Sequence, residues 1–229
     1  MHQLINNKNF RLFVYFLFLL FLSTLNNYKL KKSYKDLFKI QSINIYGLEN
    51  NQKRLILDEL RTFTDKNIFS LEKKKIIEIV ETFSFLDGYS VSKKYPSELN
   101  LYFRHTKLIA STLKDNKMFY IGNNGKLIIS KNYSLMYSLP NVFGDFKVDE
   151  FLIFLNLLKD NGFAVENISD FYFFPSKRWD IKFNNNLVIK FPRTDIEKSI
   201  KIAKIMIGEN EFKKIIDLRV SNQVIISNE

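Results

Sequence analysis

Two runs of alternating apolar and polar residues, separated by three asparagines, restrict the fold of this chain more than any other feature. They lie in the stretch KRWDIKFNNNLVIKFPR, which begins at Lys177. The alternating apolar residues are Trp179, Ile181, Phe183, Leu187, Ile189 and Phe191. Alternation with a period of two places all six side chains on one face of a β-hairpin. A folded domain has to bury that face, so the pattern predicts a sheet with a covered side.

The rest of residues 106–229 continues this pattern of short strands. Hairpin turns are indicated by KDN and NNG, whereas SLPNVFGD, with its proline and glycine, is interpreted as a loop. Two helices are expected, with apolar stripes at Val148, Phe151, Leu155 and Leu158 and at Ile196, Ile200, Ala203 and Ile207. Thr194 and Glu197 form a capping box ahead of the second helix. We therefore expect a mainly antiparallel β domain with flanking helices that ends in strands within KKIIDLRVSNQVIISNE.

The pattern at residues 37–105 predicts a smaller unit in the order strand, helix, helix, strand, strand. The first alternating run ends at Gly47, and two stretches with apolar residues at helical spacing follow it. Ser70 is the expected N-cap of the second helix. Two further alternating runs lie on either side of Pro96. A small sheet covered by two helices on one face buries both stripes at once. The expected core residues are Ile43, Ile45, Ile56, Leu60, Ile76, Val80, Leu101 and Phe103.

The run RLFVYFLFLLFLSTL begins at Arg11, and from Leu12 to Leu22 its only polar side-chain group is the hydroxyl of Tyr15. No small-x-small cleavage site follows it, so we expect an uncleaved transmembrane signal anchor at residues 11–30 behind a cytoplasmic tail at residues 1–10. More lysines follow the run than precede it, and this count taken alone favours a cytoplasmic C-terminal part.

The net charge of +11 comes from 28 lysines and 7 arginines scattered among asparagine, isoleucine and phenylalanine. No cluster has the arginine-rich, glycine-spaced pattern of a nucleic-acid module, so we interpret the lysines as a solvated surface and expect no nucleic-acid partner. The chain has no cysteine and only two histidines, His2 and His105. Thiolate metal sites are therefore excluded, and a His-based site would depend on very few imidazoles.

Motifs of catalysis are missing from the sequence. Seven glycines are scattered without a dinucleotide or Walker pattern, and neither G-x-S-x-G nor H-E-x-x-H occurs. Paired carboxylates such as Asp58 with Glu59 and Asp149 with Glu150 lie on predicted helices, where solvated charges are the ordinary interpretation. We therefore expect no enzyme, no cofactor and no small-molecule substrate.

Seven segments, in order along nearly the whole chain, resemble landmarks of the bacterial cell division family FtsQ/DivIB. They are INIYGLEN, DKNIFSLEKKKIIEIV, VSKKYPSELNLYFRHTKLIA, NNGKLI, LPNVFGD, KRWDIKF and IIDLRVSNQVII. The chain departs from the family pattern at Val220, where the family often has tyrosine, and in the turn after it, which lacks glycine.

This resemblance implies an α+β fold with a single N-terminal transmembrane helix, a POTRA domain (βααββ) at residues 37–105 and a β domain at residues 106–229. It also implies a scaffold of the inner membrane at the division septum, with both domains in the periplasm. In such proteins the β domain binds a coiled-coil membrane pair, FtsB and FtsL, and helps to control septal peptidoglycan synthesis.

An edge strand near the C-terminus offers a physical mechanism for such binding, because unpaired backbone groups can accept a strand from a partner. The expected partner-binding residues are Lys177, Arg178, Ile216, Asp217, Leu218, Arg219, Val220, Gln223, Val224, Ile225 and Ile226. For the neighbouring Trp179 we expect a core position instead, since a lone tryptophan alternating with Ile and Phe is usually buried.

Two alternatives from other classes remain open at this point. POTRA units also occur in envelope assembly and secretion factors, although those continue into a long transmembrane barrel. A membrane-anchored envelope hydrolase is the other alternative, because carboxylates alone can catalyse glycoside hydrolysis.

Overall fold

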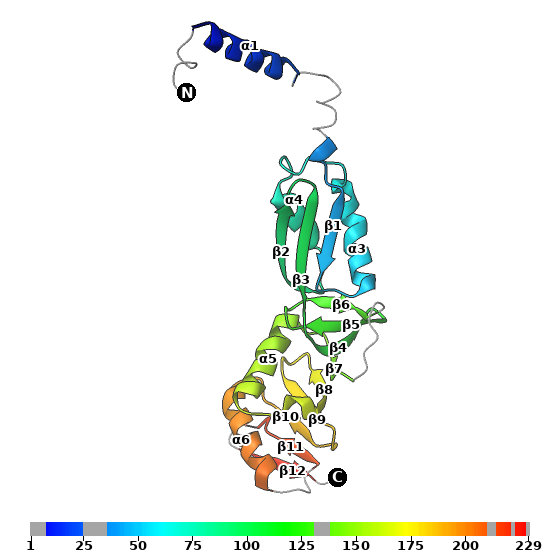
Figure 1. Cartoon of the computed structure of the whole chain (residues 1–229). Coiled ribbons are helices and arrows are strands. Elements are labelled where there is room, and N and C mark those ends of the chain that lie inside the picture. The colour runs from blue at the N-terminus through cyan, green and yellow to red at the C-terminus, as the bar shows by residue number, and fades with distance from the viewer. Residues whose placement is uncertain (1–7, 25–35, 131–137, 210–213, 221–222, 228–229) are drawn as a thin grey trace. The chain divides into compact units, whose positions relative to one another are not determined.

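The computed structural model describes residues 8–24, 36–130, 138–209, 214–220 and 223–227 (Figure 1). The chain divides into two compact units. The first unit comprises Met1–Phe83 and Gly88–Arg104, and the second comprises Ser84–Asp87 and His105–Glu229. Both combine helices with a sheet, so the fold class is α+β, as the hydrophobic patterns predict.

The apolar run near the N-terminus forms helix α1 (Lys8–Thr24), which is 17 residues long. Within the described ranges, none of the helices is both long and apolar enough to span a lipid bilayer. Residues 25–30, which complete the predicted anchor, lie outside the described residues.

The globular part of the first unit is a three-stranded sheet with two α-helices. Its elements in chain order are β1 (Ser42–Tyr46), α3 (Asn50–Leu60), the 3₁₀ helix η1 (Arg61–Phe63), α4 (Lys73–Val80), β2 (Leu86–Lys94) and β3 (Glu98–His105). The strand order is β1-β3-β2, and β1 runs parallel to β3 (Figure 1). The predicted order of strand, helix, helix, strand, strand is therefore confirmed.

The core of this unit contains seven of its eight predicted members, each at most 8% exposed. They are Ile45, Ile56, Leu60, Ile76, Val80, Leu101 and Phe103. Ile43 is only half-buried, because β1 is an edge strand with a neighbouring strand, β3, on one side only. Gly47 ends β1 as predicted, since its φ is +84° and a Cβ there would lie 2.1 Å from the carbonyl oxygen of Phe103.

Helix α4 begins later than the sequence pattern suggests. Its N-cap is Glu72, whereas the hydroxyl of Ser70 donates to the carbonyl of Asn67 at 3.0 Å. The amide of Leu71 donates to the same carbonyl at 3.2 Å. A separate turn therefore occupies the residues before the helix, and the predicted Ser70 cap is wrong.

The second unit is a nine-stranded sheet covered by two helices. Its elements in chain order are β4 (Leu108–Lys114), β5 (Lys117–Gly122), β6 (Leu127–Ile129), β7 (Asn141–Phe143), α5 (Val148–Asp160), the 3₁₀ helix η3 (Val165–Asn167), β8 (Ile168–Phe173), β9 (Trp179–Phe183), β10 (Val188–Lys190), α6 (Ile196–Glu209), β11 (Ile215–Asp217) and β12 (Ile225–Ser227). The strand order is β12-β11-β10-β9-β8-β7-β4-β5-β6. Five neighbouring pairs are antiparallel and three are parallel, so the sheet is mainly antiparallel, as predicted.

Strand β7 replaces the loop that the sequence pattern suggests for SLPNVFGD. It lies between β4 and β8 and pairs with both in parallel, so it joins the two halves of the sheet. Gly144 ends it with a φ of +108°, and a Cβ at this position would lie 2.1 Å from the carbonyl oxygen of Phe173. The loop prediction failed because three residues between Pro140 and Gly144 are too few to show alternation.

Helices α5 and α6 cover one face of this sheet, and both lie along the same side of the strands in Figure 1. A row of register partners across five strands is buried beneath them, namely Val142, Phe171, Ile181, Ile189 and Ile216. Trp179 is 5% exposed and stacks on Phe154 of α5 at 5.2 Å, which confirms its core position. Helix α6 begins at Ile196, and the carbonyl of Asp195 accepts from the amide of Ser199, so the N-cap is Asp195 rather than Thr194.

Candidate partner-binding site

Strand β12 forms one edge of the nine-stranded sheet. It pairs with β11 in antiparallel register, with Ile216 opposite Ile226 and Asp217 opposite Ile225. Strand β11 itself is enclosed, since β10 pairs with its other side. No described strand pairs with the outer side of β12, so the backbone groups on that side can accept another strand.

Backbone alternation identifies the residue of β12 that presents its peptide groups to this free edge. The amide of Leu218 donates to the Lys190 carbonyl at 2.9 Å. In the β11 segment, the N–H and C=O groups of even-numbered residues therefore point toward β10, and those of odd-numbered residues point toward β12. Asp217 is odd-numbered, so it and its partner Ile225 face each other. Ile226, the next residue, therefore directs its N–H and C=O outward.

The predicted partner-binding residues separate into an exposed and a buried group. Those with exposed side chains are Lys177, Arg219, Val220, Gln223, Val224, Ile225 and Ile226, and Arg178 is half-buried. Ile216, Asp217 and Leu218 are at most 9% exposed. The side chains of Ile216 and Asp217 therefore hold β11 in place and do not form a contact surface, whereas Leu218 can reach a partner only through the pocket that it lines.

A row of charged side chains crosses the sheet from β9 to β11. Lys190 of β10 lies opposite Asp180 on one side and opposite Asp217 on the other. At one end, the Nε of Arg219 donates to both carboxylate oxygens of Asp217, at 2.8 and 2.9 Å, and its backbone N–H donates to Oδ1 at 3.0 Å. At the other end, Arg178 lies 3.5 Å from the carboxylate of Asp180. We call these five residues the charge row.

The two carboxylates of the charge row have pKa values displaced in opposite directions. Hydrogen bonding from the Arg219 side chain lowers the pKa of Asp217. Burial raises the pKa of Asp180, and this effect exceeds the opposing attraction of Arg178. The Nε of Arg178 and the Oδ1 of Asp180 lie 3.5 Å apart, so the contact between them is a loose one. The guanidinium fork of Arg219 suits a carboxylate, and in this structure Asp217 already engages it. A partner carboxylate would therefore have to compete with Asp217.

Lys177 and Arg178 lie in the turn between β8 and β9. The guanidinium of Arg178 lies 4.0 Å from the centre of the Phe174 ring, and the Lys177 ammonium lies 5.3 Å from that of Phe173. Arg178 pairs with Asp180 and Arg219 with Asp217, so the two arginines lie at opposite ends of the charge row. Lys177 instead lines a small pocket on the helix side, beside Trp179.

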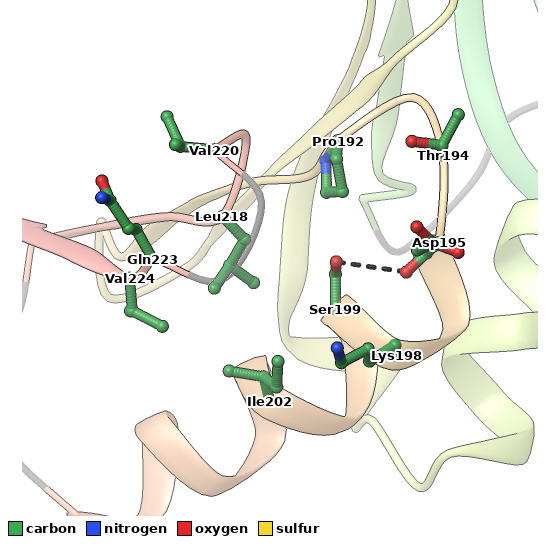
Figure 2. A pocket seen from close by; sticks show the side chains of 10 residues that line it. All are labelled: Pro192, Thr194, Asp195, Lys198, Ser199, Ile202, Leu218, Val220, Gln223 and Val224. Atoms are coloured by element: carbon green, nitrogen blue, oxygen red, sulfur yellow. Dashed lines mark hydrogen bonds between the residues drawn. The ribbon is translucent and has the colours of Figure 1, made fainter.

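A pocket of about 260 Å³ lies between the start of α6 and the residues that follow β11 (Figure 2). Four predicted partner-binding residues line it, namely Leu218, Val220, Gln223 and Val224. The other lining residues are Pro192, Thr194, Asp195, Lys198, Ser199 and Ile202, and sequence reasoning missed them. Their one sequence signal is their position directly after the predicted hairpin. Figure 2 shows the two sets facing each other, with the hydroxyl of Ser199 donating to the Asp195 carbonyl at 3.2 Å.

Comparison with known proteins gives three consistent matches. Residues 112–219 match the family described as cell division protein FtsQ/DivIB, C-terminal. The cell division protein DivIB of Clostridium botulinum strain Hall is 28% identical over 213 residues, which cover 86% of this chain and 82% of that protein. The cell division protein FtsQ of Rickettsia conorii is 24% identical over 200 residues, which cover 82% of this chain and 72% of that protein. Most of the chain is therefore similar to proteins of the FtsQ/DivIB family.

This similarity to FtsQ and DivIB proteins supports a role in cell division. The FtsQ/DivIB match begins within β4 and ends at Arg219, so it includes the charge row and excludes β12. The major extracytoplasmic domain of DivIB from Geobacillus stearothermophilus, a solved structure, is 15% identical and has a TM-score of 0.33 over 47% of this chain and 98% of that one. A TM-score of that size does not establish a common fold, so the similarity to this family rests on the sequence matches.

Proposed function

We propose that this protein is a scaffold of the bacterial division machinery that is anchored in the inner membrane and has no catalytic activity. Residues 11–30 form its single transmembrane pass, the tail at residues 1–10 lies in the cytoplasm, and residues 37–105 form a POTRA domain. Both units lie in the periplasm at the septum. The apolar run and the family of its relatives support this assignment.

The second unit binds a coiled-coil membrane pair of the FtsB/FtsL kind and in this way helps to control septal peptidoglycan synthesis. The observation that carries this proposal is the free outer edge of β12, where Ile226 directs its peptide groups outward and Ile225 and Ile226 are 50% and 44% exposed. An extended segment of the partner adds as a further strand, with backbone hydrogen bonds giving affinity and alternate side chains giving specificity. Val224 lies beside this edge and lines the pocket at the start of α6. This pocket offers a place for one side chain of the partner strand.

The test is a proline at the residue whose N–H faces the partner. Ile226→Pro removes the outward donor and places the proline ring against the incoming strand, yet it leaves the pairing of Ile225 with Asp217 intact. Affinity for the purified coiled-coil pair should fall by about tenfold or more, since a hydrogen bond is lost and a clash is added. Ile226→Ala is the matched control, because it shortens the same side chain and keeps the N–H.

Folding of each variant is checked by the fluorescence of Trp179, which lies in the core of the second unit. Equal affinities of a folded Ile226→Pro variant and the parent would show that β12 is structural and that the partner docks elsewhere. The proposed topology is tested separately by adding protease to spheroplasts. Digestion of residues 40–229 is expected, and protection until lysis would show that the count of flanking lysines predicts the orientation correctly.

A further inference from the structure

One end of the first unit carries an exposed cluster of aromatic side chains. Phe38 contacts Phe69 edge-on at 5.0 Å between ring centroids, and Phe69 stacks on Tyr95 at 4.8 Å. Phe69 is 59% exposed, Tyr95 is 55% exposed and the adjacent Leu37 is 47% exposed. Large apolar groups gathered in this way on a surface mark an interaction site more often than isolated ones do. We call Leu37, Phe38, Phe69 and Tyr95 the aromatic pole.

Backbone hydrogen bonds join the three segments that build the aromatic pole. The amide of Ile68 donates to the Phe38 carbonyl at 2.8 Å, and the amide of Ile40 donates to the Lys66 carbonyl at 3.0 Å. The β2–β3 turn is attached through the Gln41 amide, which donates to the carbonyl of Ser97 at 2.9 Å. The aromatic rings are therefore presented by a connected surface.

The charges around the aromatic pole are mainly positive. Its three segments, residues 36–40, 64–75 and 93–98, contain seven lysines and four carboxylates. Two of the carboxylates are already paired within the unit, Asp36 with Lys39 at 2.7 Å and Glu98 with Lys94 at 3.1 Å. Three of the lysines, at positions 73–75, form the first turn of α4, where the helix dipole disfavours positive charge. Three lysines at this position lower the stability of the helix, and such locally unfavourable residues are expected where a surface binds a partner.

The aromatic pole is the end of the unit at which the chain arrives from the N-terminal helix. The parallel strands β1 and β3 both begin at this end, with Ser42 opposite Glu98, and run away from it. Six residues, 31–36, separate the aromatic pole from the proposed anchor at residues 11–30. A linker of six residues spans about 20 Å at most, so an anchored chain holds this end close to the bilayer.

We propose that the aromatic pole docks on the membrane surface, with its rings in the interfacial layer and its lysines on the phosphates of anionic phospholipids. This inference rests on the proposed anchor, and it adds a second, reversible contact between the protein and the bilayer. Aromatic rings favour the headgroup region, and each lysine near an anionic surface strengthens attachment. Docking fixes the orientation of the first unit relative to the membrane plane.

A single-cysteine reporter tests this in the full chain, which contains no native cysteine. Ser70, an exposed residue beside Phe69, is replaced by cysteine and labelled with a fluorophore, and the chain is reconstituted in vesicles that contain nitroxide-labelled lipid. Quenching is expected in vesicles of phosphatidylcholine with phosphatidylglycerol and should be weak in phosphatidylcholine alone. The double variant Phe69→Ser with Tyr95→Ser should lose the quenching. Replacing lysines 74 and 75 by glutamine should reduce the docking constant by about fivefold per lysine.

The same unit supplies a matched control. Tyr46 and Tyr102 are also stacked, at 4.7 Å, and are 44% and 50% exposed, but Tyr46 is the last residue of β1 and Tyr102 lies opposite it in β3, away from the aromatic pole. Replacing both by serine should leave the quenching at position 70 unchanged. Vesicle-bound chains without quenching, or with equal quenching in both lipids and in all variants, would overturn the proposal. Alkaline washing tests the anchor separately: removal of the chain from the vesicles by the wash would refute the transmembrane anchor. The quenching measured before the wash would still show whether the aromatic pole contacts lipid.

Discussion

Replacing Arg219 by glutamine should destabilise the second unit through the loss of one well-formed ion pair. The Asp217 side chain is 11% exposed and that of Arg219 is 41% exposed, so the carboxylate is nearly buried and its partner is not. Hydrogen bonds to a charged group contribute about 1.5–3 kcal/mol, and the exposure of Arg219 reduces this to about 1–2 kcal/mol. The backbone N–H of residue 219 still donates to Asp217 in the variant, so the carboxylate keeps one partner.

The assay is thermal unfolding followed by Trp179 fluorescence, because this single tryptophan lies in the core of the second unit. A loss of that size should lower the melting temperature by about 4–8 °C for a unit of this length. Arg193→Gln, which changes an exposed arginine in the loop before α6, is the charge-matched control and should have little effect.

The effect should depend on pH in a defined direction. Arg219 lowers the pKa of Asp217, so the pair contributes fully above the unfolded carboxyl pKa, about 3.9, and the contribution is lost as the pH falls through the lower folded value. The difference between Arg219→Gln and the parent should therefore shrink on acidification. An unchanged melting temperature at neutral pH would refute this reasoning and would mean that Arg219 is free to pair with a partner.

Three further variants test other parts of the fold and site. Asp180→Asn should stabilise the second unit at neutral pH, because burial raises the pKa of Asp180 and the charged carboxylate therefore destabilises the folded state above that pKa. The gain in stability should vanish in acid, where the carboxyl group of the parent is protonated. A loss of stability at neutral pH would contradict this prediction. Gly144→Ala should cost about 2–4 kcal/mol in chemical denaturation, because a Cβ would meet the Phe173 carbonyl at a φ of +108°, and a neutral effect would mean that β7 can shift. Ile76→Ala, at a site 1% exposed, should cost about 2–5 kcal/mol in the first unit when unfolding is followed by circular dichroism, and an unchanged curve would contradict the assigned core face of α4.

Local periodicity was sufficient to predict most elements of both units. The β9–β10 hairpin was predictable because its alternation is long and interrupted only by the asparagine turn, where Asn186 has a φ of +68°. Helix α5 was predictable because its buried residues Phe151, Leu155 and Leu158 recur at helical spacing. Each of these signals lies within one short segment, so it needs no knowledge of the rest of the chain.

Strand β7 shows where such reasoning stops. It is three residues long, and its pairing partners in β4 and β8 lie about 30 positions away on either side in the sequence. The hydroxyl of Thr112 donates to the Val142 carbonyl at 2.8 Å, which fixes the strand to β4 by a contact that no local pattern encodes. Parallel pairing of this kind depends on tertiary structure, which overrides the turn-like composition around it.

The sequence predicts which segment forms the candidate site, but it does not predict how the side chains of the site are arranged in space. Alternation marked the C-terminal strands, yet which of their side chains are buried depends on α6 and on the register with β10. The charge row could not be foreseen, because Asp180, Lys190 and Asp217 become neighbours only through the pairing of three strands. Arg219 and Asp217 are only two residues apart, but the sequence pattern does not distinguish a contact between them from two side chains that both face a partner.

The short length of β12 limits how much strand addition alone can contribute to binding. Within its three residues Ile226 is the one whose peptide groups face outward, and two backbone hydrogen bonds contribute about 1–3 kcal/mol in total. Micromolar affinity requires about 8 kcal/mol, so most of the binding free energy has to come from side chains. Three groups near this edge are available to supply it: the exposed Ile225, the pocket at the start of α6, and Arg178, the half-buried end of the charge row. Partner specificity in the proposed complex is therefore expected to reside in these surroundings of β12 more than in the strand itself.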